Sequence, residues 1–141
     1  MAEALAAESA EFDEVAQDYR AQHAHSTGVS VDALDYFASY KIEYLKTLWQ
    51  ARGRQPKVLL DFGAGIGNAL APMHEAFPEA DIVALDVSRA SLDLVDAQAI
   101  PCVRTLAYDG LQIPLPDASI DCVFTACVFH HIPAQHHVAL L

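Results

Sequence analysis

The chain has 141 residues, and its 8 Lys and Arg against 19 Asp and Glu give it a formal net charge of -11. Nucleic-acid binding depends on neutralising phosphates, and the chain has no cluster of basic residues, so we expect no nucleic-acid partner. The N-terminus lacks a basic leader and no apolar run reaches the length of a membrane span. We therefore expect a cytoplasmic protein that does not contact a membrane.

The N-terminal part is predicted to be helical. Apolar spacing predicts one helix near residues 10–22 and a longer one over residues 31–50. Gly and Pro within residues 53–56 predict a linker. We divide the chain into a helical cap with its linker, residues 1–56, and a second domain over residues 57–141.

The longer predicted helix carries an apolar stripe at helical spacing, and such a stripe is more often core than ligand pocket. We expect it to be buried. Its members are Phe37, Tyr40, Tyr44 and Leu48.

A strand that breaks into a glycine-rich turn follows the linker. Val58–Leu60 is a continuous apolar run, which is typical of a central parallel strand, and the next residues read Asp-Phe-Gly-Ala-Gly-Ile-Gly-Asn. Glycines at such a turn let a ligand approach the backbone. Asn68 is predicted to cap the following helix. Only Ile66 separates the last two glycines, whereas the dinucleotide fingerprint has two residues there, which argues against NAD.

Three more strands are predicted, each with polar groups after its carboxyl end, where open α/β sheets bind ligands. The strand over residues 81–86 ends in Asp86, roughly 20 residues beyond the glycine turn, where a carboxylate accepts ribose hydroxyls. The strand over residues 103–107 runs into Tyr-Asp-Gly. The strand over residues 121–128 runs into Phe-His-His-Ile-Pro.

Together these motifs resemble the class I S-adenosylmethionine-dependent methyltransferases of the bacterial small-molecule type, over residues 58–133. The resemblance implies an α/β fold with a Rossmann-like doubly wound parallel sheet. Four strands in the order 3-2-1-4 would form its N-terminal portion, preceded by two N-terminal helices. The motifs are Asp61-x-Gly63-x-Gly65-x-Gly67, Asp86, Asp109 and His130-His131-Ile132-Pro133.

The resemblance also implies a role for each motif in binding S-adenosylmethionine. Asp61 and the three glycines would hold the methionine end of the cofactor, Asp86 the ribose, and Asp109 the adenine amino group. The implied cofactor-binding set is completed by Ala64, Val87, Gly110 and Tyr19, the last of these on a helix over the cofactor.

His130 and His131 follow the fourth strand, and the resemblance places their segment beside the transferred methyl group. Either residue could act as a base for the acceptor, and a purely structural turn is the alternative. His136 and His137 would point about 100° apart on a helix, with no carboxylate among them, so we expect a solvated helix face and no metal site. We expect the three cysteines to be small core residues: Cys102, Cys122 and Cys127.

Few residues follow Pro133, so the family's later strands are not represented and the chain is expected to be truncated at its C-terminus. The edge of the fourth strand would then be uncovered, which predicts self-association. Three functions stay open. The first is in-line methyl transfer to a small-molecule acceptor. Within this interpretation, the truncated chain is either active or inactive on its own. The second is a non-catalytic fragment that binds cofactor or needs a partner, and the third is an NAD-dependent oxidoreductase.

Overall fold

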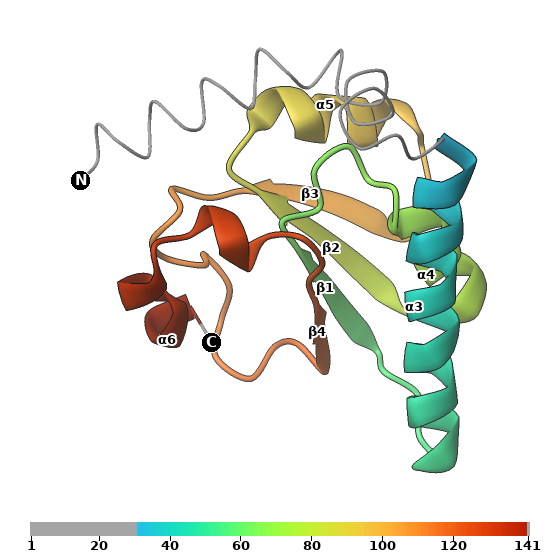
Figure 1. Cartoon of the computed structure of the whole chain (residues 1–141). Coiled ribbons are helices and arrows are strands. Elements are labelled where there is room, and N and C mark those ends of the chain that lie inside the picture. The colour runs from blue at the N-terminus through green and yellow to red at the C-terminus, as the bar shows by residue number, and fades with distance from the viewer. Residues whose placement is uncertain (1–30, 141) are drawn as a thin grey trace.

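The structure is a computed structural model, and it describes residues 31–140 (Figure 1). The long helix is present as α3, Val31–Ala51, close to its predicted bounds. The helix predicted near residues 10–22, and Tyr19 with it, lies outside the described residues. Within those residues no helix is long and apolar enough to cross a membrane.

The sheet has four parallel strands in the order β3-β2-β1-β4, which confirms the predicted topology. Parallel pairing places the carboxyl ends of all four strands at one edge of the sheet. The strands are β1 Val58–Phe62, β2 Asp81–Asp86, β3 Val103–Ala107 and β4 Cys122–Phe124.

The edge strand β4 is anchored to β1 at its start. In the register, Leu60 of β1 lies opposite Val123 of β4. Just before β4, the carboxylate oxygen Asp121 Oδ2 accepts hydrogen bonds from the backbone N–H groups of Lys57 at 2.7 Å and Val58 at 2.9 Å. These bonds fix where β4 begins along β1.

The fourth strand is shorter than predicted, so the boundary expected at residue 128 is wrong. β4 ends at Phe124, and Cys127 has a φ of +60°, which an extended strand cannot hold. The chain then enters the short 3-10 turn η1, Phe129–His131. Apolar character alone predicted a strand where the backbone in fact turns at the carboxyl edge of the sheet.

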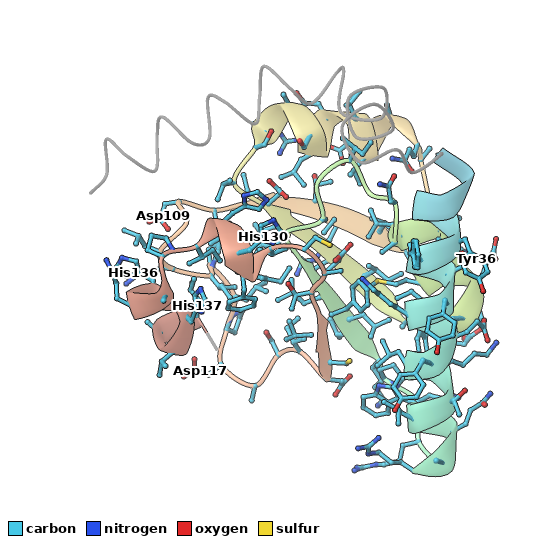
Figure 2. All side chains as sticks on the ribbon, viewed as in Figure 1. Tyr36, Asp109, Asp117, His130, His136 and His137 are labelled. Atoms are coloured by element: carbon cyan, nitrogen blue, oxygen red, sulfur yellow. The ribbon has the colours of Figure 1, made fainter. Side chains whose placement is uncertain are left out.

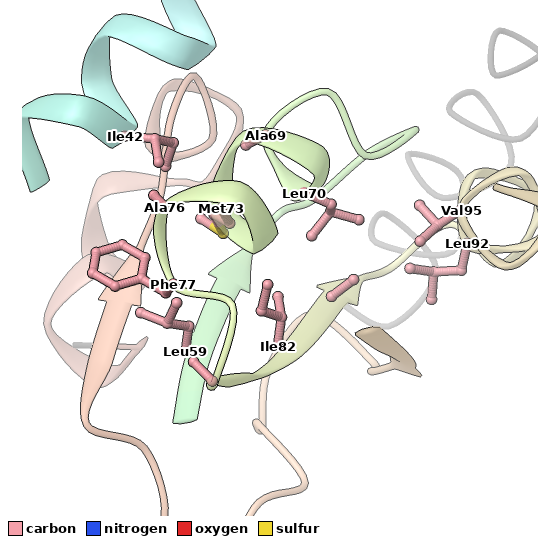
Figure 3. Close-up of a cluster of buried hydrophobic side chains, with 12 residues drawn as sticks. Ile42, Leu59, Ala69, Leu70, Met73, Ala76, Phe77, Ile82, Leu92 and Val95 are labelled. Atoms are coloured by element: carbon pink, nitrogen blue, oxygen red, sulfur yellow. The ribbon is translucent and has the colours of Figure 1, made fainter. Parts of the chain in front are cut away.

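Helices cover one face of the sheet (Figures 1 and 3). They are α3, α4 Leu70–Ala76 and α5 Arg89–Ala97. Their buried side chains meet those of β1 and β2 in one cluster, because alternate strand residues point to the same face. Members of this cluster include Ile42, Leu59, Leu70, Met73, Phe77, Ile82, Leu92 and Val95.

The segment after β3 and β4 covers the opposite face. It ends in a second 3-10 turn, η2 Ala134–His136, and the short helix α6 His137–Leu140. Four strand residues form the buried centre of this second cluster: Leu60, Phe62, Val83 and Leu85. Val128, Phe129, Ile132 and Leu140 pack against it.

The aromatic stripe of α3 is exposed, so the prediction that it forms core is wrong. Its three aromatic members, Phe37, Tyr40 and Tyr44, are between 53% and 64% exposed. A second stripe with the same helical period faces the sheet instead, with Ile42 buried and Leu45 and Trp49 partly buried against it. Leu48 is half-buried and, with Tyr40, Tyr44 and Phe124, lines a shallow groove between α3 and β4.

Two smaller predictions are also wrong. Cys102 and Cys127 are exposed and lie where the chain turns with positive φ, whereas Cys122 of β4 is half-buried. Asn68 does not cap α4. The helix begins at Leu70 without a side-chain cap, and no described residue bonds the buried oxygen Asn68 Oδ1.

Candidate cofactor site

The glycine-rich turn is held against β2 and α5. The N–H groups of Gly63 and Ala64 both donate to the carbonyl of Leu85, at 2.8 and 3.0 Å. From the end of α5, Gln98 Nε2 donates to the carbonyl of Ile66 at 2.6 Å. These bonds give partners to backbone N–H and carbonyl groups of the turn and fix its shape. The turn follows directly from β1.

Two of the three glycines are required by close packing. A Cβ on Gly63 would lie 2.3 Å from Val128 Cγ2, and one on Gly67 would lie 2.8 Å from Leu70 Cδ1. At Gly65 a Cβ would meet nothing within 4 Å. Gly65 therefore borders open space in which a ligand can approach the backbone.

Asp86 lies at the carboxyl end of β2 and contacts the turn. Its Oδ2 accepts from the N–H of Gly65 at 2.7 Å, and its Oδ1 accepts from the N–H of Ser88 at 2.9 Å. Ser88 in turn caps α5 by accepting from the N–H of Ser91 at 3.1 Å. A carboxylate can accept about four hydrogen bonds, so Asp86 can hold the turn and also accept from a ligand's hydroxyls.

Asp61 is a buried acid beside this turn. It is only 3% exposed, and no Lys or Arg in the described part of the chain forms an ion pair with it. Burial, and secondly the negative charge of Asp86, raise the pKa of Asp61 to about 7. A cationic group arriving here would favour its ionised form, so these residues fit a cofactor that carries an ammonium.

Asp109 follows β3 and closes its own turn. Its Oδ1 accepts from the N–H groups of Leu111 and Gln112, both at 2.9 Å. These bonds, that of Gln112 first, lower the pKa of the exposed Asp109 carboxyl. The predicted adenine contact would therefore come from a carboxylate that is already fixed in position. Gly110 beside it has a φ of +82°.

Tyr108 was not among the predicted site residues. Its ring packs on that of Phe62, with centroids 5.8 Å apart. Burial raises the pKa of Tyr108 to about 12, with smaller contributions from the carboxylates of Asp86 and Asp109. Its position directly after β3 could have identified Tyr108 as a candidate site residue, because ligands bind at the carboxyl ends of such strands. Gln98 had no such signal, because it lies 32 residues from its partner, Ile66.

His130 and His131 lie on η1 and are exposed. Figure 2 labels His130 on this turn. Their rings are 3.9 Å apart with an interplanar angle of 43°. Because Val128 packs against Gly63, this turn lies beside the glycine turn. Among residues 31–140, no three His, Cys, Asp or Glu side chains come together as a metal site.

The structure thus brings most of the predicted site residues to one edge of the sheet. The residues after β1 and β2 are joined by hydrogen bonds, and Val87 lies between Asp86 and Ser88. The residues after β3 and β4 lie on either side of this pair of strands. The residues so gathered are Asp61, Gly63, Ala64, Gly65, Gly67, Asp86, Val87, Asp109, Gly110, His130 and His131.

Comparison with known proteins identifies a family to which the chain is matched and two relatives. The profile of a family described as "Methyltransferase domain" matches residues 59–141. The malonyl-[acyl-carrier protein] O-methyltransferase of Dechloromonas aromatica is 46% identical over 66 residues, 47% of this chain and 24% of that protein. The tRNA (guanine-N(7)-)-methyltransferase of Hydrogenovibrio crunogenus is 32% identical over 79 residues, 51% of this chain and 33% of that protein. The chain thus spans between 24% and 33% of the length of these two relatives.

A solved structure shares the fold. The plantazolicin methyltransferase BpumL, in complex with a monoazolic desmethylPZN analog and S-adenosylhomocysteine, aligns with a TM-score of 0.62. The alignment covers 84% of this chain and 49% of that chain, at 17% sequence identity. At this identity the likeness concerns the fold alone.

Proposed function

Because this chain belongs to the methyltransferase domain family, we propose that it binds S-adenosylmethionine at the glycine turn and takes part in methyl transfer to a small-molecule acceptor. One observation carries the proposal: a buried carboxyl, Asp61, lies next to a glycine turn that is open at Gly65. The methionine end of the cofactor has a cationic amino group and requires close contact with backbone. Asp61 offers a carboxylate to the amino group, and the turn at Gly65 offers accessible backbone.

The chemistry of the bound cofactor is an electrophilic methyl group on a positively charged sulfur. The protein's part is then mainly to hold donor and acceptor in line. In our proposal Asp61 binds the ammonium, Asp86 accepts from the ribose hydroxyls, and Asp109 accepts from the adenine amino group. His130 or His131 would remove a proton from an acceptor that must lose one.

A small molecule fits this chain better than a nucleic acid as acceptor. Some relatives are named as tRNA methyltransferases, so the family alone does not decide the acceptor. The charge of -11 on this chain, however, repels a polyanion, and phosphate neutralisation supplies most of non-specific nucleic-acid affinity. A neutral or cationic acceptor is therefore our proposal.

Calorimetric titration of the purified chain with S-adenosylhomocysteine, with NAD as the control ligand, tests the cofactor. We expect saturable binding of S-adenosylhomocysteine alone. Asp61→Asn should weaken that binding by roughly tenfold or more, since a charge-assisted hydrogen bond is lost. Asp117→Asn is the matched control, because this exposed carboxylate lies away from the turn and should leave the affinity unchanged.

Other outcomes of this titration have clear meanings. Binding of NAD alone would overturn the proposal in favour of an oxidoreductase. Binding of neither ligand would favour a non-catalytic fragment whose site requires a partner. Unchanged affinity in the Asp61→Asn protein would move the ammonium site elsewhere.

The role of the two histidines needs a turnover assay, with release of S-adenosylhomocysteine measured against a panel of small acceptors. His130→Ala or His131→Ala should lower turnover by roughly a hundredfold if that residue is the base. Unchanged turnover in both variants would remove the proposed role.

A further inference from the structure

His137, the first residue of α6, closes the turn that carries His130 and His131. Its ring nitrogen Nε2 lies 2.9 Å from the carbonyl oxygen of Phe129 and 2.8 Å from that of Ile132. A carbonyl oxygen only accepts, so Nε2 must carry the hydrogen that these two oxygens share. The expected solvated helix face is therefore wrong for His137, which is half-buried.

The turn that His137 closes packs on the sheet. The ring of His137 lies perpendicular to that of Phe129, with centroids 5.1 Å apart, and Phe129 packs on Phe62 of β1 at 5.8 Å. Within the turn, the N–H of His131 donates to the carbonyl of Val128 at 2.9 Å. The N–H of Ile132 donates to the carbonyl of Phe129 at 3.2 Å. His137 thus adds side-chain bonds at both ends of a short backbone turn.

This turn also meets the glycine turn. The methyl groups of Val128 occupy the space that a Cβ on Gly63 would need, so Val128 and Gly63 cannot shift independently. A restraint on the carbonyls of Phe129 and Ile132 therefore acts, through Val128, on the segment proposed to hold the cofactor.

We propose that His137 is a positioning residue, which ties the Val128–Ile132 turn to α6 and so fixes His130 and His131 against the cofactor site. The part of this inference that concerns the cofactor rests on the proposed function. The part that concerns the turn stands on the geometry alone.

The neighbouring residue supplies a matched control. His136 is also a half-buried histidine, yet its side chain forms no hydrogen bond with any residue that the structure describes. Figure 2 shows both residues on the segment after η1. His136→Ala removes the same atoms without removing the proposed restraint, and His137→Gln keeps an N–H donor.

Amide hydrogen exchange measured by NMR on the full chain tests the restraint. In the His137→Ala protein we expect the amides of His131 and Ile132 to exchange about tenfold faster, the effect of losing roughly one hydrogen bond. The amides of Leu60 and Val83 in the sheet should keep their wild-type rates. His137→Gln should restore slow exchange at the turn, and His136→Ala should change nothing there.

Three results would overturn the proposal: unchanged exchange at the turn, equally faster exchange in the sheet, or no restoration by His137→Gln. Calorimetry on the same variants tests the link to the cofactor. His137→Ala should weaken S-adenosylhomocysteine binding by roughly threefold, and His136→Ala should not. Unchanged affinity with a loosened turn would overturn the positioning role. A wild-type chain that binds no ligand would defeat the proposed function, while the exchange result would still decide the restraint.

Discussion

At the residue scale, Asp61 shows how a proposed binding residue can oppose the stability of the fold. Its carboxyl is buried near Asp86, where a negative charge is poorly solvated and repelled. The same surroundings suit a ligand that brings a positive charge. The free protein therefore bears the cost of burying a group that, in our proposal, binds the cofactor.

Asp61→Asn should stabilise the ligand-free protein at neutral pH. The folded-state pKa of about 7 lies above the unfolded value of 3.8, so the folded chain retains a proton that the unfolded chain releases. Stability contributed by this group is fully present below pH 3.8 and is lost as the pH rises to about 7. The full shift corresponds to about 4 kcal/mol, an upper limit for the gain from the substitution.

Urea unfolding of wild type and Asp61→Asn across this pH range measures the difference. The gap between their free energies of unfolding should widen with pH and level off above neutrality. A gap that is constant with pH would show that Asp61 ionises normally in the folded chain. Asp117→Asn, at an exposed site, should give no such gap.

The same carboxyl should make cofactor affinity depend on pH. Below its pKa of about 7, Asp61 must lose its proton before it can pair with an ammonium. The affinity for S-adenosylhomocysteine should therefore rise by up to about tenfold per pH unit toward neutrality and then become constant. Calorimetry over this range checks the profile, which Asp61→Asn should flatten. A rise of the same slope in that variant would assign the proton to another group.

At the scale of elements, two glycines of the same turn have different roles: Gly63 is needed for packing, and Gly65 is proposed to contact the cofactor. Gly63→Ala places a Cβ 2.3 Å from Val128 at a φ of +76°, so we expect a loss of stability of roughly 2 to 4 kcal/mol. Gly65→Ala meets no atom within 4 Å and should cost only about 1 kcal/mol, for its φ of +54°. Urea unfolding compares the two variants.

The ligand affinities of these variants should follow a different order from their stabilities. Gly65→Ala fills the open space where the cofactor is proposed to lie, so it should weaken S-adenosylhomocysteine binding despite a nearly normal stability. Val128→Ala added to Gly63→Ala should recover part of the lost stability. A Gly65→Ala protein with wild-type affinity would show that the cofactor does not approach this residue.

Sequence patterns predicted elements well where one physical requirement dominated. The buried strands β1 and β2 and the glycine turn between sheet and helix have such patterns. The patterns failed where two sets of apolar residues on one helix had the same helical spacing. In α3 the stripe of Tyr40 and Tyr44 has the same helical spacing as the stripe of Ile42 and Trp49, and only packing against the sheet selects the second. The end of β4 was missed because Cys127 adopts a turn conformation that its residue type does not indicate.

At the scale of the whole molecule, the side bounded by β4 and α3 is apolar and uncovered within the described residues. Val123 is 57% exposed on the edge strand, and Tyr40 and Tyr44 line the adjoining groove. Unpaired strand edges pair readily with other chains. A second copy of the chain could extend the sheet through β4 and cover the aromatic rings.

We predict that the chain self-associates at tens of micromolar and that light scattering will detect it. A net charge of -11 on each copy opposes the contact, so association should strengthen as salt rises to about 0.5 M. Val123→Lys should abolish it by placing a charge at the strand edge. Val138→Lys, an exposed apolar residue on α6, is the matched control. A monomer at every salt concentration would disprove the prediction.

The strand order was also predicted, because the resemblance to the class I methyltransferases implied it, and the observed order agrees. The hydrogen bonds within the site were harder to predict from the sequence. Asp86 was expected from its place after β2, yet its bond to Gly65 and the clamp from Gln98 to Ile66 depend on distances across the fold. Such contacts are set only once the elements have packed.

The bonds from Asp121 to Lys57 and Val58 join residues more than 60 positions apart, whereas β1 and β2 pair across a much shorter stretch of chain. Contacts between distant residues form slowly, and a chain leaving the ribosome completes its N-terminal contacts first. The glycine turn and Asp86 can therefore assemble while β4 is still being synthesised. The growing chain would form the proposed cofactor site around the glycine turn before the turn that carries His130 and His131. A nascent intermediate could then already gain stability from a bound ligand.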